Sequence, residues 1–201
     1  MNPEYIYCEQ QSEEWFKVRL GIVTASHFAE VLCKGSGRKT YMMRLLAERM
    51  TGEVHPAFQS QYMEEGAETE VYARQYYEQL KKVEVKQVGF IKIGEIGASP
   101  DGLVGEDGEI EIKCPLPSTH LDYIIKDKMP TEYIPQVQGN LWISGRQWCD
   151  FISFDPRVKN RPYWSVRVNR DESYINNLLK KEVKQFVFEL NSLFEKVSIP
   201  F

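Results

Sequence analysis

Apolar residues recur at helical spacing through the N-terminal part of the chain. Ser12, followed by two glutamates, predicts a helix over 13–20, because a serine oxygen and early negative charges stabilise the N-terminus of a helix. A short helix opening at 24–26, a helix over 39–50 and a longer helix over 60–80 are predicted next. Residues 1–80 are therefore expected to be mostly helical.

The pattern becomes strand-like in the middle of the chain. Strands are predicted over three consecutive segments separated by glycine-containing turns, namely 83–93, 96–103 and 109–114. Further along, the pattern predicts a helix over 132–144, strands over 148–154 and 162–168, and a last helix over 171–196. This order predicts a single α/β domain over 1–201, with a mixed central β-sheet in 83–168 flanked by helices.

The composition fits one globular domain, with 201 residues of which 42% are hydrophobic and 27% charged. No apolar run reaches the roughly 18 residues of a membrane span, and the first residues do not resemble a signal peptide, so a cytosolic protein is expected. The four cysteines form no CxxC pair and the three histidines no HxxxH spacing. These spacings disfavour a zinc site, a disulfide framework and a histidine-rich metal site.

The formal net charge of −4 argues against a protein that holds nucleic acid by bulk positive charge. It leaves open a protein whose DNA contacts are confined to a groove or channel. In such a protein, bound metal ions supply part of the positive charge locally.

Two short stretches carry candidate chemistry, 99–102 (SPDG) and 109–113 (EIEIK). Because side chains alternate along a strand, Glu111 and Lys113 share one face of the second stretch, while its two isoleucines point to the core. The glycine-bounded turn between the stretches predicts a hairpin. That hairpin brings Asp101 back beside Glu111.

Two carboxylates that converge at the end of a sheet offer the oxygen ligands that Mg²⁺ prefers. Lys113 beside them could orient or activate a water and offset charge on a phosphate. Asp101 and Lys113 are expected on a face that is open to solvent. The alternative is a solvated hairpin with scattered charges, since an acidic residue followed at some distance by Glu-x-Lys is common by chance.

The residues of these stretches resemble the PD-(D/E)xK motif of restriction-endonuclease-like nucleases, with Pro100-Asp101 and Glu111-Ile112-Lys113 as its two halves. The wider sequence resembles the phage exonucleases of the lambda type, also called the YqaJ or alkaline-exonuclease family. The matching blocks occur in order between about residues 12 and 170: 15–21 (WFKVRLG) with 24–26 (TAS), 66–70 (GAETE), 99–103 (SPDGL), 111–115 (EIKCP), 136–138 (QVQ) with Trp142, and 155–157 (DPR). The resemblance implies a restriction-endonuclease-like core.

The resemblance also implies a metal centre. Asp101, Glu111 and the backbone carbonyl of Ile112 would bind Mg²⁺, and Glu70 would help to hold a second ion. Two such ions clamp the attacking and leaving oxygens at a scissile phosphate, and Mn²⁺ accepts the same ligands. The alternative for Glu70 is a surface carboxylate on an acidic helix.

Two further residues gain roles from the same resemblance. Lys113 would position or deprotonate the attacking water. Gln136 would donate a hydrogen bond near the reacting phosphate, and its alternative is an amide on a helix surface.

Arg19 and Ser26 match residues that form a pocket for a 5′-terminal phosphate in this family, with Ser99 nearby. A guanidinium binds phosphate through two hydrogen bonds, and hydroxyls near a helix start add donors. The alternative for Arg19 is a cation at a helix end. The loop at 34–38 departs from the family pattern, and Arg38 is the candidate for a further phosphate contact there, or belongs to a solvated basic loop.

The expected function is a Mg²⁺-dependent 5′→3′ exonuclease that degrades one strand of double-stranded DNA to 5′-mononucleotides and leaves a 3′ overhang. The resemblance further implies a homotrimeric ring around the DNA and a single-strand annealing protein as partner, in phage recombination inside a bacterial host. One alternative keeps the metal site in a structure-specific or restriction-type endonuclease. Another is a non-catalytic DNA-binding or assembly module.

Overall fold

The structure is a computed structural model that describes the backbone of residues 2–54 and 61–199, with side chains described outside 61–68. Its elements are, in chain order, β1 (Glu4–Ile6), α1 (Glu13–Arg19), β2 (Val23–Thr24), the 3₁₀ turn η1 (Ala25–His27), α2 (Phe28–Leu32), α3 (Ser36–Thr51), α4 (Gln61–Lys81), β3 (Val85–Lys86), β4 (Phe90–Ile93), β5 (Ile96–Ala98), β6 (Gly102–Val104), β7 (Gly108–Lys113), α5 (Pro117–Lys126), the 3₁₀ turn η2 (Thr131–Tyr133), α6 (Ile134–Ser144), β8 (Trp148–Phe154), β9 (Tyr163–Asn169), α7 (Glu172–Tyr174), the π-helical turn η3 (Ile175–Leu179) and α8 (Lys180–Ser198).

The predicted mixed sheet is present, together with a second one. The larger sheet has five strands in the order β3-β6-β7-β8-β9, with β7 and β8 parallel and the other pairs antiparallel. The smaller sheet has four strands in the order β1-β4-β5-β2, with only β2 and β5 parallel. The fold is therefore of the α/β class expected from the sequence.

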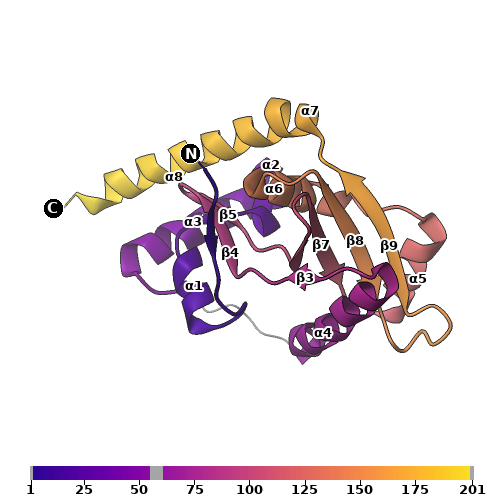
Figure 1. Cartoon of the computed structure of the whole chain (residues 1–201). Helices are drawn as coiled ribbons and strands as arrows, with labels where there is room; N and C mark the ends of the chain where they lie inside the picture. Colours follow the sequence, from indigo (N-terminus) through magenta and orange to yellow (C-terminus); the bar gives the residue numbers. More distant parts are fainter. Residues whose placement is uncertain (1, 55–60, 200–201) are drawn as a thin grey trace.

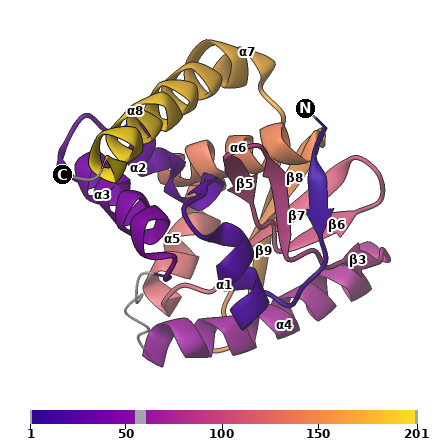
Figure 2. The same cartoon turned by 90° about the vertical axis from the view of Figure 1, so that its left-hand side faces the viewer.

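Helices cover both faces of the larger sheet. On one face α4 buries Ala73 and Tyr77 against Ile110 and Ile112 of β7. On the other face the apolar side chains of α5 and α6 pack against Phe151 of β8. Figures 1 and 2 show α4 and α6 on opposite sides of β7 and β8. Each Å² of apolar surface buried this way stabilises the fold by roughly 25 cal/mol.

The smaller sheet shares a core with the N- and C-terminal helices. Buried side chains of α2, α3 and α8, among them Phe28, Leu45 and Phe186, meet residues of β2, β4 and β5 in this core. Figure 1 shows α8 lying across α2 and α3. The predicted cap of the first helix is confirmed, since the Ser12 hydroxyl accepts a hydrogen bond from the Trp15 amide at 3.2 Å.

Two segments that were each predicted as one continuous strand are each divided into two strands in the structure. The segment 83–93 forms two strands, β3 and β4, and 96–103 forms β5 and β6, with the members of each pair in different sheets. The second break falls at Ser99, Pro100 and Asp101, where the chain crosses from the smaller sheet to the larger one. Proline lacks an amide hydrogen, so it suits this crossing better than a strand interior.

The sequence also missed β1, β2 and helix α5. The expectation that this face of β7 is open to solvent is wrong as well, because α6 side chains bond to Glu109 and Glu111, which are both buried. Asp101 and Lys113 are half-buried. Alternation alone cannot distinguish a solvated polar face from a polar face that another element covers. No described helix has the length and apolar character to cross a membrane.

Gly139 lets α6 approach η1 and α2 closely. A Cβ added there would lie 2.6 Å from the Phe28 ring and 3.1 Å from Ala25 Cβ. We therefore expect Gly139→Ala to lower the free energy of unfolding by about 1–3 kcal/mol, since a well-packed core absorbs an extra methyl only by shifting its neighbours. Urea unfolding followed by circular dichroism measures this change.

Gly37 in α3 provides the matched control. A Cβ there meets only Glu30 Cγ at 3.9 Å, and an alanine in a helix restricts the unfolded chain. Gly37→Ala is expected to leave the stability unchanged or to raise it slightly. Equal stabilities of the two variants would contradict the close packing at Gly139.

Candidate active site

Asp101 lies at the entry to the larger sheet, directly beside β7. Its amide donates to the Ile110 carbonyl at 3.1 Å, and its carboxylate accepts the Ile112 amide at 2.6 Å. The side chain thus supplies a hydrogen-bond acceptor to β7 just beyond the paired residues of β6. The predicted hairpin is confirmed, and it brings Asp101 next to the strand that carries Glu111.

Glu111 is buried beneath α6 and accepts hydrogen bonds from two different elements. Its Oε1 atom accepts from Lys113 Nζ and from Gln136 Nε2, both at 2.6 Å. Its Oε2 atom accepts from Asn140 Nδ2 at 3.0 Å. Gln136 and Asn140 are four residues apart on α6, so they lie on the same side of the helix and reach the same carboxylate.

Glu70 reaches this centre from α4 through an arginine. Arg74, one helical turn further on, pairs with Glu70 at 2.6 Å and donates from Nε to the Asp101 carbonyl at 3.1 Å. Arg74 therefore ties α4 to the crossing between the sheets. It also places the Glu70 carboxylate on the side of Asp101.

The three carboxylates influence each other electrostatically. Burial, and then the negative charges of Glu111 and Glu70, raise the pKa of Asp101 well above its usual range. Burial also raises the pKa of Glu70, although Arg74 opposes that shift. Burial would lower the pKa of Lys113, but the nearby Glu111 and Asp101 outweigh it and raise that pKa above its ordinary value. Lys113 is thus a protonated ammonium in this arrangement.

The carboxylate oxygens of Asp101, Glu111 and Glu70 are suitable ligands for a divalent cation. Among the described residues, however, no three His, Cys, Asp or Glu side chains lie close enough together to form a ready metal site. Each carboxylate is instead bound by N–H donors. Because Glu111 and Glu70 both raise the pKa of Asp101, a cation placed between these carboxylates would be stabilised by all three. Hard carboxylate oxygens are the ligands that Mg²⁺ prefers.

Arg19 and Ser99 meet in a second cluster. The Arg19 guanidinium donates to Ser99 Oγ at 2.8 Å and lies 3.9 Å above the Trp15 ring. The indole of Trp15 also donates to Ser99 Oγ, at 3.0 Å, while the Ser99 hydroxyl donates to the Gly89 carbonyl at 2.7 Å. The Ser99 hydrogen is therefore already used, and Ser99 serves to orient Arg19. Burial lowers the pKa of Arg19 to about 10, which still leaves it charged at neutral pH.

Ser26 is exposed in η1 and lies near this cluster without bonding to Arg19 in the structure. Its hydroxyl is 3.2 Å from Thr24 Oγ1 and 3.1 Å from His27 Nδ1. Arg38 takes a different partner, since it pairs with Glu189 of α8 at 2.7 Å. A DNA contact by Arg38 stays a prediction.

Several residues of these clusters were missed in the sequence. Asn140 and Arg74 could have been found from helical spacing, because each lies four residues after a candidate already chosen. His27 and Arg44, which pair at 2.9 Å between η1 and α3, carried no such signal. Their contact depends on how the two elements pack.

The sequence profile of the YqaJ-like viral recombinase domain matches residues 14–147. The chain belongs to this family. The match covers the crossing at 99–101 and the residues of α1, α4, β7 and α6 that belong to the two clusters. No curated protein matches the sequence.

Solved structures agree with this assignment. The alkaline exonuclease LHK-Exo of Laribacter hongkongensis is 42% identical, with 92% of this chain and 96% of that chain covered and a TM-score of 0.87. The structure of LHK-Exo in complex with dAMP has the same identity and coverage and a TM-score of 0.88. A phage-related exonuclease from Haemophilus somnus 129PT, 17% identical over 88% of this chain and 96% of that one, shares the fold with a TM-score of 0.71. Membership in the family, with an exonuclease at 42% identity, supports a nuclease role.

Proposed function

We propose that this chain is a Mg²⁺-dependent 5′→3′ exonuclease that degrades one strand of double-stranded DNA to 5′-mononucleotides and leaves a 3′ overhang. In the cytoplasm of a bacterial host, that overhang would serve recombination with a single-strand annealing protein. The observation that carries the proposal is the crossing from Ser99 to Asp101. It joins the cationic cluster, formed by Arg19 with Ser99, to the carboxylate cluster, formed by Asp101, Glu111 and Glu70. The likeness to an alkaline exonuclease, solved also with dAMP, supports it.

The carboxylate cluster is the proposed catalytic centre. Asp101, Glu111 and the Ile112 carbonyl would hold one cation, and Glu70 would help to hold a second. Two Mg²⁺ ions, or Mn²⁺ in their place, supply positive charge to the attacking and leaving oxygens of a phosphodiester. Lys113 would position the attacking water and balance phosphate charge, because it carries a proton beside Glu111.

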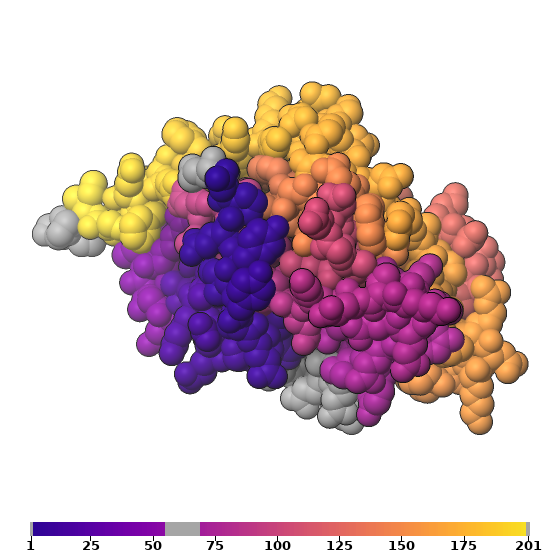
Figure 3. All heavy atoms as spheres, viewed as in Figure 1, coloured from indigo at the N-terminus to yellow at the C-terminus, as the bar shows by residue number. Residues whose placement is uncertain are grey.

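The cationic cluster is the proposed binding site of the 5′-terminal phosphate. Arg19 and Ser26 would donate hydrogen bonds to the phosphate, and Ser99 orients Arg19. Two residues of extended chain span at most about 7 Å. A terminal phosphate held by Arg19, beside Ser99, would therefore lie a short distance from Asp101. The phosphodiester that meets the carboxylates would then be close to the strand end, and this favours mononucleotide release. Figure 3 shows the N-terminal segment, in indigo, and α4, in magenta, on the same face of the molecule.

The first prediction concerns cleavage. Asp101→Asn and Lys113→Met are each expected to lower the rate of cleavage by about 10²-fold or more, since one removes a cation ligand and the other a positioned charge. Asparagine is preferred to alanine because Asp101 accepts the Ile112 amide, and an unpaired buried amide costs about 1–3 kcal/mol. The assay follows end-labelled linear duplex with Mg²⁺ and after chelation by EDTA.

Asp107→Asn, exposed in the turn of the same hairpin, is the matched control and should cleave at the parent rate. A folded Asp101→Asn or Lys113→Met variant that digests duplex at that rate would exclude this catalytic centre. Mg²⁺-dependent cleavage of closed circular duplex would indicate an endonuclease. Inactivity of the parent protein with every cation would indicate a binding module.

The second prediction concerns the substrate end. Duplex with a 5′-phosphate is expected to be degraded faster than duplex with a 5′-hydroxyl, and Arg19→Ala should reduce that ratio by roughly tenfold or more, because a charged hydrogen-bonding partner is lost. Rates on both substrates give the ratio. Lys17→Ala removes an exposed charge from the same helix and should preserve it. An unchanged ratio in Arg19→Ala would reject the terminal-phosphate pocket.

The third prediction concerns assembly. A homotrimeric ring would hold DNA topologically, and this reconciles DNA binding with a net charge of −4 because only the channel must be positive. Light scattering at micromolar concentration should give the mass of a trimer. Digestion of long duplex should also continue after excess competitor DNA is added to loaded enzyme. A monomer, or digestion that stops at once, would reject the ring.

A further inference from the structure

A second arginine lies near Arg19 in the cationic cluster. The charge of Arg44, on α3, acts on Arg19, and both charges act on His27. Among the described residues, no carboxylate pairs with Arg19 or Arg44, and the nearby Glu48 accepts the Gly21 amide at 3.0 Å. The Nε atom of Arg44 is buried and has no acceptor in the part of the chain that the structure describes. The cluster thus contains more positive charge than its own residues neutralise.

The contact between Arg44 and His27 determines where the imidazole carries its hydrogen. A guanidinium has only donors, so Arg44, 2.9 Å from His27 Nε2, must donate to that nitrogen. The hydrogen of a neutral His27 is therefore on Nδ1. This atom lies 3.1 Å from both Thr24 Oγ1 and Ser26 Oγ.

A neutral His27 is favoured by its surroundings. Its ring stacks on Tyr41 at 4.5 Å, and the Arg44 guanidinium lies 4.9 Å from the centre of the same Tyr41 ring. Burial, followed by the charges of Arg44 and Arg19, lowers the pKa of His27 to about 4. His27 therefore donates from Nδ1 without adding charge of its own.

The Ser26 hydroxyl has two neighbours from which it can accept, and its own hydrogen is then available to an outside acceptor. Ser26 Oγ can accept from His27 Nδ1 and, at 3.2 Å, from the Thr24 hydroxyl. A hydroxyl that accepts from its neighbours directs its own hydrogen away from them. Because Ser26 is exposed, this hydrogen can reach a ligand.

We propose that Arg44 and His27 complete the terminal-phosphate pocket: Arg44 is a second guanidinium for a phosphate monoester, and His27 is a positioning residue that directs the Ser26 hydroxyl toward it. The inference rests on the proposed 5′-phosphate pocket. Two guanidinium groups favour a doubly charged monoester over the singly charged diester inside a strand. The pocket then selects a strand end by charge as well as by shape.

The test compares steady-state kcat/KM on duplexes with a 5′-phosphate and with a 5′-hydroxyl. Arg44→Met should reduce the phosphate preference roughly tenfold, as expected for loss of a charged hydrogen bond. His27→Gln can still accept from Arg44 but loses the Nδ1 donor, so it should reduce the preference several-fold. His27→Asn retains a donor near the Nδ1 position and should preserve most of it.

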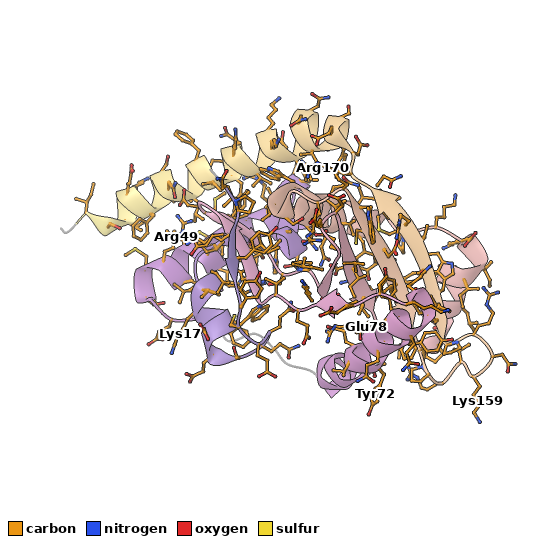
Figure 4. The ribbon with its side chains drawn as sticks, viewed as in Figure 1. Lys17, Arg49, Tyr72, Glu78, Lys159 and Arg170 are labelled. Carbon is orange, nitrogen blue, oxygen red and sulfur yellow. The ribbon has the colours of Figure 1, made fainter. Side chains whose placement is uncertain are left out.

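A double variant tests whether His27 acts through Ser26. Ser26→Ala combined with His27→Gln should lose no more preference than Ser26→Ala alone, since both remove the same hydrogen bond. Lys17→Met, a lysine that points outward from α1 in Figure 4, is the control for loss of charge and should leave the preference unchanged. If Arg44→Met does not fold, Arg44→Lys retains the charge without the planar guanidinium and should show a smaller loss.

The outcomes separate this inference from the proposal on which it rests. A parent enzyme without preference for a 5′-phosphate would reject the pocket itself. A parent preference that Arg19→Ala abolishes, but that folded Arg44→Met and His27→Gln variants retain, would reject only the roles of Arg44 and His27. Additive losses in the double variant would reject the action of His27 through Ser26.

Discussion

The three-residue crossing between the two sheets is the constraint on which both candidate sites depend. Ser99 is bound to the side chains of α1, the Pro100 carbonyl accepts from Gln10 Nε2 at 3.0 Å, and the Asp101 carboxylate accepts the Ile112 amide at 2.6 Å. A segment held at every residue cannot shift at one end without disturbing the other. The geometry between the cationic cluster and the carboxylates is therefore a property of the sheets rather than of a free loop.

The side-chain periodicities of strand β7 and helix α6 allow the carboxylate of Glu111 to be buried between them. An isolated buried charge costs several kcal/mol, so Glu111 needs donors that are already in place. Strand alternation puts Lys113 on its side of β7, and the four-residue repeat of α6 brings Gln136 and Asn140 to it. Its neighbour Glu109 is less well satisfied: Ser144 donates to one oxygen at 2.9 Å, the other has no partner within the described chain, and burial raises its pKa to about 8. A buried carboxylate oxygen without a partner destabilises the fold, and such local destabilisation is typical of polar centres retained for function.

The features that could be predicted from the sequence are those that a short-range residue pattern determines. The hairpin that places Asp101 beside Glu111 follows from a turn between two alternating stretches, and it is confirmed. The break at 87–89 was missed because the segment around it reads as one strand, and only long-range pairing assigns β3 to β6 and β4 to β1. The pair of His27 and Arg44 lies beyond sequence reasoning for the same reason. Seventeen residues separate its members, and only the packing of η1 on α3 brings them together.

The net charge of −4 is a poor guide to the field that a phosphate meets at these sites. At physiological ionic strength, charges beyond about 8 Å are largely screened, so each cluster acts through its nearest groups. Around Arg19 and Arg44 these groups are cationic or neutral, apart from Glu48, which is bound to a backbone amide. Around Asp101 they are the carboxylates of Glu111 and Glu70, paired with Lys113 and Arg74, and the excess negative charge repels phosphate until a cation lies between the carboxylates. Phosphate binding at one cluster and cation binding at the other are thus compatible with an acidic chain, since neither depends on the sum of its charges.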